Sequence, residues 1–242
     1  MAIHHAVEGT VASITIDRTE RRNAINLEAL EALDAAFTAT TDAGARCLVI
    51  SGAGGHFCAG ADLKELEDLA FTHRLRQVLD HLAALDIPTI AAVAGACMGL
   101  GMQLALACDI RVASDDAYFG VPVAKLGLMV DHWTLRRLAA AVGIGTARLM
   151  VLTAEILSSD DAWRVGLTQV RGGLDAAEAI AARVTGLAPL SIAGSKLGLD
   201  LIERPTTHTA YDDAFRAAWA SDDLAEGRRA FAERRAPDFT GR

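Results

Sequence analysis

The sequence has few cysteines, and their spacing is not that of a metal site. The four are Cys47, Cys58, Cys97 and Cys108, and each lies within an apolar run without forming a CxxC pair. The seven histidines form no HExxH motif. We therefore expect buried free thiols instead of disulfides, and we expect no metal.

Long apolar runs and an excess of basic residues are also lacking. No run reaches the roughly 18 to 20 apolar residues that cross a bilayer. Residues 1–10 carry His4, His5 and Glu8 where a signal peptide would need an apolar segment. Lys and Arg number 23 against 31 Asp and Glu, which gives a net charge of -8. We therefore expect a cytoplasmic protein with no membrane span and no nucleic-acid partner.

Hydrophobic residues, by contrast, are abundant. They make up 52% of the 242 residues, whereas charged residues make up 22%. A chain of this length can bury a substantial core. The excess of apolar residues predicts further buried surface and favours contacts between subunits.

One central stretch, residues 87–113, changes from a predicted strand into a predicted helix. Its apolar segment 89–94 lies between Pro88 and Gly95, whereas residues 100–107 are helix formers that follow Gly99. The first amides of a helix lack partners within it and attract negative charge. No Lys or Arg stands at this helix start, so it suits a single oxyanion better than a polyphosphate. A simple packing unit is the alternative.

A second stretch repeats this arrangement earlier in the chain. Residues 47–50 predict a strand, residues 51–60 form a glycine-rich loop, and a helix is expected to start at Asp62. One fold could therefore bring backbone N–H groups near Ala61 and Leu100 onto the same oxygen. Two such donors form an oxyanion hole, in which each is worth about 10²–10³ in rate.

Five segments together resemble the crotonase family, the enoyl-CoA hydratase/isomerase superfamily. They are residues 57–64 (Phe-Cys-Ala-Gly-Ala-Asp-Leu-Lys), 95–109, 119–122, 126–128 and 226–241. The resemblance covers almost the whole chain. It implies an α/β spiral of repeated ββα units over residues 1–188. A helical C-terminal segment, residues 189–242, would then make contacts with CoA and between subunits in a homotrimer or a hexamer built as a dimer of trimers.

The resemblance also implies a site for an acyl-CoA or enoyl-CoA thioester. Ala61 and Leu100 would supply the oxyanion-hole amides, and no cofactor is implied beyond the CoA of the ligand itself. The implied substrate-binding positions are Arg22, Ala24, Ile25, Ala59, Asp62, Leu63, Gly99, His132, Trp133, Phe215 and Arg234. Arg22 could equally be a solvated loop charge, and Phe215 a core aromatic.

The chain departs from the family at the two positions where hydratases carry catalytic glutamates. Gln103 and Val123 stand there, and neither can transfer a proton as a carboxyl group does. Loss of one general acid or base typically costs about 10²–10⁴ in rate. Hydration of the usual kind should therefore be very slow.

Asp131 is an acidic residue that matches the catalytic aspartate of some relatives, including dienoyl-CoA isomerases. It also precedes the helix predicted for residues 132–142, where it would be a good N-cap. His132 and Trp133 could wall an acyl pocket, although Trp133 could equally belong to the core. Farther along, residues 167–170 resemble a final strand.

Three functions remain open. The first is a fatty-acid-metabolism protein that binds acyl-CoA with little or no hydratase activity, since Gln103 and Asp131-His-Trp resemble a mycobacterial-type subgroup that lacks both glutamates. The second is a double-bond isomerase that uses Asp131. The third is a slow enoyl-CoA hydratase.

Overall fold

The computed structural model describes residues 2–62, 69–202, 216 and 219–237. In this part of the chain the larger sheet has the strand order β1-β2-β3-β4-β6-β9. Its strands are β1 (Ile3–Glu8), β2 (Val11–Ile16), β3 (Cys47–Gly52), β4 (Thr89–Val93), β6 (Ile110–Ala113) and β9 (Val170–Arg171). β1 pairs with β2 antiparallel, and the other pairs are parallel. A smaller sheet joins β5 (Ala96–Met98), β7 (Tyr118–Gly120) and β8 (Ile156–Ser158).

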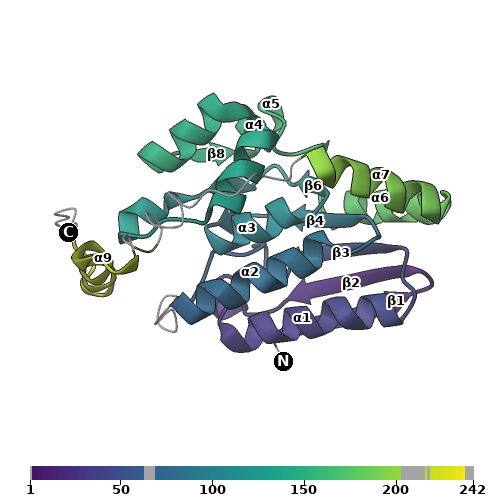
Figure 1. The fold of residues 1–242 in the computed structure, drawn as a ribbon, viewed down its shortest axis with the longest axis horizontal. Coiled ribbons are helices and arrows are strands. Elements are labelled where there is room, and N and C mark those ends of the chain that lie inside the picture. Colours follow the sequence, from purple (N-terminus) through teal and green to yellow (C-terminus); the bar gives the residue numbers. More distant parts are fainter. Residues whose placement is uncertain (1, 63–68, 203–215, 217–218, 238–242) are drawn as a thin grey trace.

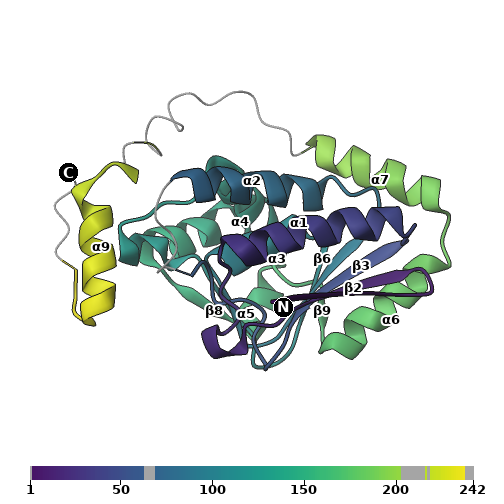
Figure 2. The same cartoon turned by 90° about the horizontal axis from the view of Figure 1, so that it is seen from below.

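Helices cover both faces of the larger sheet. The helices of the described residues are α1 (Leu27–Asp42), α2 (Leu69–Ala83), α3 (Leu100–Ala107), α4 (His132–Thr153), α5 (Ser159–Arg164), α6 (Leu174–Thr185), α7 (Pro189–Ile202) and α9 (Asp222–Glu233), with short 3-10 helices η1 (Thr19–Arg21) and η2 (Pro122–Leu126). Figure 1 shows α1 and α2 side by side, and Figure 2 shows α6 on the opposite face. In both views α7 and α9 lie at opposite ends of the molecule. The predicted mixed α/β fold is confirmed.

Side chains along each strand point alternately to the two faces of the sheet, and the core is therefore divided into two clusters. In β3, Leu48 and Ile50 join the large cluster that includes side chains of α1, α2 and α3. Cys47 and Val49 join the smaller cluster with α6. Successive strand side chains point to opposite faces, so a strand covered by helices on both sides is apolar throughout.

Helix α3 is buried along its whole length, and two arginines bind its C-terminal carbonyls. The Arg111 guanidinium donates to the carbonyls of Ala105 (3.1 Å), Cys108 (2.9 Å) and Leu167 (2.7 Å). Arg137 donates to the carbonyl of Leu106 at 2.9 Å. Burial lowers the pKa of Arg111 from its usual value. Because the last carbonyls of a helix lack partners within it, these bonds fix the end of α3 that lies farthest from its glycine turn.

One sequence expectation needs correction. The strand expected at residues 167–170 is wrong in its bounds, because the amides of Leu167 and Thr168 turn back to the Ala162 carbonyl and β9 starts only at Val170. The helix expected over residues 132–142 does end at Val142, because Gly143 has the non-helical angles φ 75° and ψ 154°; a second helical segment then continues α4 to Thr153.

The predicted boundary at residue 188 falls between two helices that both contact the rest of the chain. Lys196 of α7 donates to the Asp109 carboxylate at 2.8 Å and to the Ile87 carbonyl at 3.0 Å. The division into two parts therefore stays a prediction. Across the described ranges, no single helix is long and apolar enough to cross a membrane; only the bent pair Leu174–Thr185 and Pro189–Asp200, at 115°, passes that test jointly.

Candidate functional site

The glycine-rich turns that precede Ala61 and Leu100 lie side by side because a backbone bridge joins them. Cys58 and Cys97 form an isolated parallel bridge, in which the Cys58 amide donates to Ala96 and the Cys58 carbonyl accepts from Met98. Ala61 and Leu100 each follow their bridging cysteine by three residues. Gly101 is required here, since a Cβ atom would lie 2.2 Å from the Cys58 carbonyl oxygen. The first turn of α3 can therefore approach the first glycine loop closely.

The local hydrogen bonds determine where the two amides point. Beside Ala61, the Gly60 carbonyl accepts from Ile25 (2.9 Å) and the Asp62 amide donates to Ile25 (2.8 Å), so the Ala61 amide faces away from Ile25. Leu100 is the first residue of α3, where an amide has no partner within the helix. Both residues line the same cavity.

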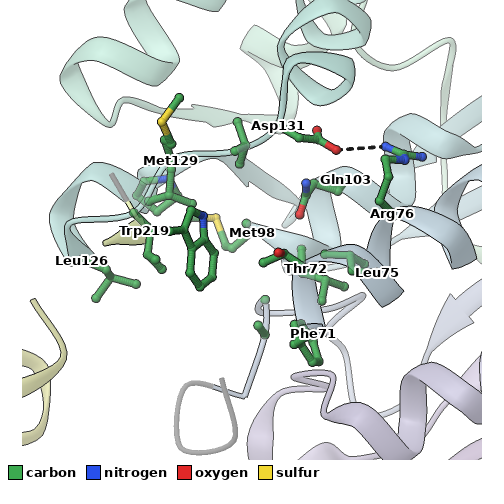
Figure 3. A pocket seen from close by; sticks show the side chains of 18 of the residues that line it. Phe71, Thr72, Leu75, Arg76, Met98, Gln103, Leu126, Met129, Asp131 and Trp219 are labelled. Carbon is green, nitrogen blue, oxygen red and sulfur yellow. Dashed lines mark hydrogen bonds and ion pairs between the residues drawn. The ribbon is translucent and has the colours of Figure 1, made fainter. Parts of the chain in front are cut away.

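This cavity of about 160 Å³ is mainly apolar. Its lining comes from both glycine turns, α2, α3, η2, the segment before α4 and the C-terminal Trp219 (Figure 3). The lining residues are Ala59, Gly60, Ala61, Phe71, Thr72, Leu75, Arg76, Met98, Gly99, Leu100, Gln103, Pro122, Val123, Leu126, Leu128, Met129, Val130, Asp131 and Trp219.

Gln103 and Val123, which the sequence resemblance assigns to the positions of the family glutamates, both line the cavity. Gln103 is one helical turn beyond Leu100 on α3 and is 8% exposed, and Val123 belongs to η2. Residues three apart on a helix are neighbours on its surface, so the side chains of Leu100 and Gln103 share one face of α3. The site thus combines two backbone amides with an amide side chain and an aliphatic side chain.

Asp131 also reaches the cavity, but its carboxylate is held by other groups. Its Oδ1 accepts from the Thr134 amide (2.9 Å) and hydroxyl (2.5 Å), which makes it the N-cap of α4. Its Oδ2 lies 3.4 Å from Arg76 Nη1 (Figure 3). Gln103 Nε2 in turn donates to the Thr134 hydroxyl oxygen at 2.8 Å. The capping role expected for Asp131 is therefore confirmed.

Two of the expected pocket walls lie elsewhere. Neither His132 nor Trp133 is among the described residues that line the cavity. The Trp133 ring instead packs between two guanidinium groups, with Arg76 Cζ 3.6 Å and Arg137 Cζ 4.7 Å from its centroid. The ring also packs against the hydrophobic core, which is the alternative that the sequence left open for Trp133.

Several expected CoA-binding positions lie next to the first glycine turn. The Arg22 carbonyl accepts from the Ala59 amide at 3.0 Å, while Ala24 and Ile25 follow Arg22 alongside this turn. The Arg22 side chain is exposed. The Asp62 carboxylate is nearly buried and pairs with Arg18 at 3.2 Å.

The remaining expected positions divide into two groups. Leu63 and Phe215 lie outside the described residues. Arg234 is an exposed residue that caps α9 in the left-handed conformation, with φ 56°, and it does not line the cavity. Its expected contact with CoA stays a prediction.

Burial disfavours the thiolate form of the two cysteines beside the turns. Complete burial raises the pKa of Cys58 to about 12 and raises that of Cys97 well above its usual value. The thiolate is the reactive form of cysteine. Within the described ranges, no group of three or more His, Cys, Asp or Glu side chains is arranged to hold a metal ion.

Sequence reasoning missed Arg76, Thr134 and Trp219. Thr134 stands three residues after the N-cap Asp131, and an N-cap side chain commonly accepts a hydrogen bond from the amide at that spacing. The contact of Thr134 with Asp131 could therefore have been predicted. Arg76 and Trp219 reach the cavity only through the packing of α2 and of the C-terminal segment, and no local pattern marks them.

A family model described as enoyl-CoA hydratase/isomerase matches residues 6–242. The probable enoyl-CoA hydratase echA6 of Mycobacterium leprae is 41% identical over 239 residues, with 96% of each chain covered. Its counterpart in Mycobacterium tuberculosis is 40% identical over 235 residues, again with 96% of each chain covered. The structure is similar to carnitinyl-CoA hydratase from Mycobacterium avium, with TM-score 0.86, 34% identity, and 100% and 99% of the two chains covered. A methylmalonyl-CoA decarboxylase in complex with 2-nitronate-propionyl-CoA shares the fold, with TM-score 0.92, 23% identity and the same coverage.

Proposed function

The chain belongs to the enoyl-CoA hydratase/isomerase family, and from that premise we propose that it binds fatty acyl-CoA thioesters with little or no hydratase activity. The Ala61 and Leu100 amides would hold the thioester carbonyl in an oxyanion hole. This proposal puts the protein in fatty-acid metabolism in the cytoplasm. It requires no cofactor other than the CoA of its ligand.

The observation that carries this proposal is the chemistry of the cavity beside the two amides. Gln103 and Val123 line it where hydratases of the family have glutamates. Hydration needs one group to take a proton from water and another to deliver a proton to carbon, and neither side chain can transfer a proton. Binding of the carbonyl needs only the amides and an apolar lining, and the presence of Ala61 and Leu100 in one mainly apolar cavity supports this.

A titration with acyl-CoAs of increasing chain length, run beside a crotonyl-CoA hydration assay, tests this function. Calorimetry should detect saturable binding of at least one chain length, and the assay should detect little or no water addition. Absence of binding at every length would contradict the proposal, as would turnover at the rate of an ordinary hydratase.

The second candidate function is a double-bond shift catalysed by Asp131, because this carboxylate lines the cavity. Its present contacts argue against that role. Oδ1 accepts two hydrogen bonds from Thr134, and Oδ2 faces Arg76. A general base must instead be within reach of a substrate proton.

We expect Asp131→Asn to leave turnover of enoyl- and dienoyl-CoA substrates unchanged at background level. The asparagine oxygen can still cap α4, so the loss of the partly exposed pair with Arg76 should cost about 1 kcal/mol or less. Product analysis measures the first effect and thermal unfolding the second. A double-bond shift in the unmodified protein that disappears in Asp131→Asn would make this an isomerase.

We also propose that the chain assembles into a homotrimer or a hexamer. Large apolar side chains remain exposed on the second half of α4 and on α7, among them Ile144 (62%), Leu152 (76%) and Leu190 (88%). Surfaces of this kind are typical of interfaces. Sedimentation at micromolar concentration should therefore detect no stable monomer, and a monodisperse monomer that still binds acyl-CoA would refute this assembly.

A further inference from the structure

The hydrogen bonds around Thr134 determine which end of the Gln103 amide faces the cavity. A carboxylate only accepts hydrogen bonds, so the single hydroxyl proton of Thr134 is donated to Asp131 Oδ1, at 2.5 Å. The Thr134 oxygen can then only accept from Gln103. The amide nitrogen must therefore face Thr134, and it lies 2.8 Å from the hydroxyl oxygen.

The amide oxygen of Gln103 is consequently the atom turned toward the cavity. Figure 3 shows the nitrogen on the side of Asp131 and the oxygen on the side of Thr72, and both Thr72 and Gln103 line the cavity. Arg76 is a cationic donor at this end. Its Nη2 pairs with Asp80 (3.0 Å), its Nη1 lies 3.4 Å from Asp131 and its Cζ lies 3.6 Å from the Trp133 ring centroid, whereas its Nε is buried without a hydrogen-bond partner among the described residues.

We propose that Thr134 and Asp131 fix the Gln103 amide so that the cavity presents a hydrogen-bond acceptor beside the thioester. The protein then selects acyl chains by the polarity of the group at C3, preferring a 3-hydroxyacyl-CoA, which donates, over a 3-oxoacyl-CoA, which only accepts. Thr134 is a positioning residue that acts through Gln103. This inference rests on the proposed binding of acyl-CoA at the Leu100 amide.

Hydrogen-bond energies give the expected size of the preference for the 3-hydroxy form over the 3-oxo form. A hydroxyl that donates to the nearly buried Gln103 oxygen gains a hydrogen bond, whereas an oxo group there leaves two acceptors facing each other without a partner. The 3-hydroxyl form should therefore bind about tenfold or more tightly than the 3-oxo form.

The experiment is calorimetric titration with hexanoyl-CoA, each enantiomer of 3-hydroxyhexanoyl-CoA, and 3-oxohexanoyl-CoA. The proteins are the unmodified chain, Thr134→Val, Thr134→Ser and Gln103→Met. Thr134→Val removes the hydroxyl, so the amide can turn and offer its nitrogen to the oxo group, and the preference should fall to about twofold or less. Thr134→Ser keeps the hydroxyl and should keep the preference. Gln103→Met removes the acceptor and should abolish it.

The outcomes separate this inference from the function on which it rests. If hexanoyl-CoA fails to bind the unmodified chain, the proposed function fails and this inference fails with it. If hexanoyl-CoA binds but the hydroxy and oxo forms bind equally, only the inference is overturned. A preference that persists in Thr134→Val also overturns it. If Thr134→Val does not fold, a preference for the hydroxy form that persists in Gln103→Met overturns the inference instead.

Discussion

The double variant Gln103→Glu, Val123→Glu should hydrate a short enoyl-CoA at least about 10²-fold faster than the unmodified protein. Both positions line the cavity that contains the Ala61 and Leu100 amides. The new carboxyl groups would therefore flank a thioester that is already held, and they would supply the missing acid and base. Water addition is measured as the loss of the enoyl thioester's ultraviolet absorbance.

The gain should stay below the rate of a natural hydratase for a structural reason. The Thr134 hydroxyl proton is committed to Asp131, so a carboxyl at position 103 would face an oxygen lone pair. The like charge of Asp131 would also raise the pKa of that carboxyl. Gln103→Glu, Val123→Gln is the matched control, since it has nearly the same shape but only one ionisable group. Equal rates in the two variants would show that paired carboxyl groups are not what the site lacks.

Leu100→Pro should weaken acyl-CoA binding by about fivefold to tenfold relative to Leu100→Ala. Proline removes the amide hydrogen of Leu100 and is well tolerated at the first position of a helix, which Leu100 occupies. Both variants lose the buried leucine side chain. Their difference therefore isolates the N–H group, and calorimetric affinities measure it.

Circular dichroism and thermal unfolding should first establish that both Leu100 variants are folded. Equal affinities for the thioester in two folded variants would remove Leu100 from the oxyanion hole. Ala61 would then have to act with a donor other than the α3 amide.

The glycine spacing predicted the start of α3 at Leu100, whereas the helix expected to start at Asp62 falls on residues 63–68, outside the described part of the chain. Glycines near Ala61 and Leu100 act through local conformation, so their spacing alone indicates where helix and loop amides become available. The parallel bridge between Cys58 and Cys97 then brings the two turns together. Asp131 was likewise predictable as a cap, since capping depends on the residues immediately following it.

Side chains that reach the site through tertiary packing were harder to predict. For Trp133 the sequence left a pocket wall and a core position open, and only the packing of α2 and α4 brings Arg76 and Arg137 onto its ring and places it against the core. Trp219 lines the cavity from near the C-terminus, far from the other lining residues in sequence. The residue pattern within a single helix predicts neither the position of Trp133 nor that of Trp219.

The most direct test of the central claim is the rate of crotonyl-CoA hydration by the unmodified protein at a saturating concentration established by calorimetry. Saturation ensures that slow turnover cannot be attributed to weak binding. We predict a rate at least about 10²-fold below that of a family hydratase with both glutamates, assayed in parallel. A rate equal to that of the hydratase would contradict the proposal that Gln103 and Val123 leave a site that binds the thioester without hydrating it.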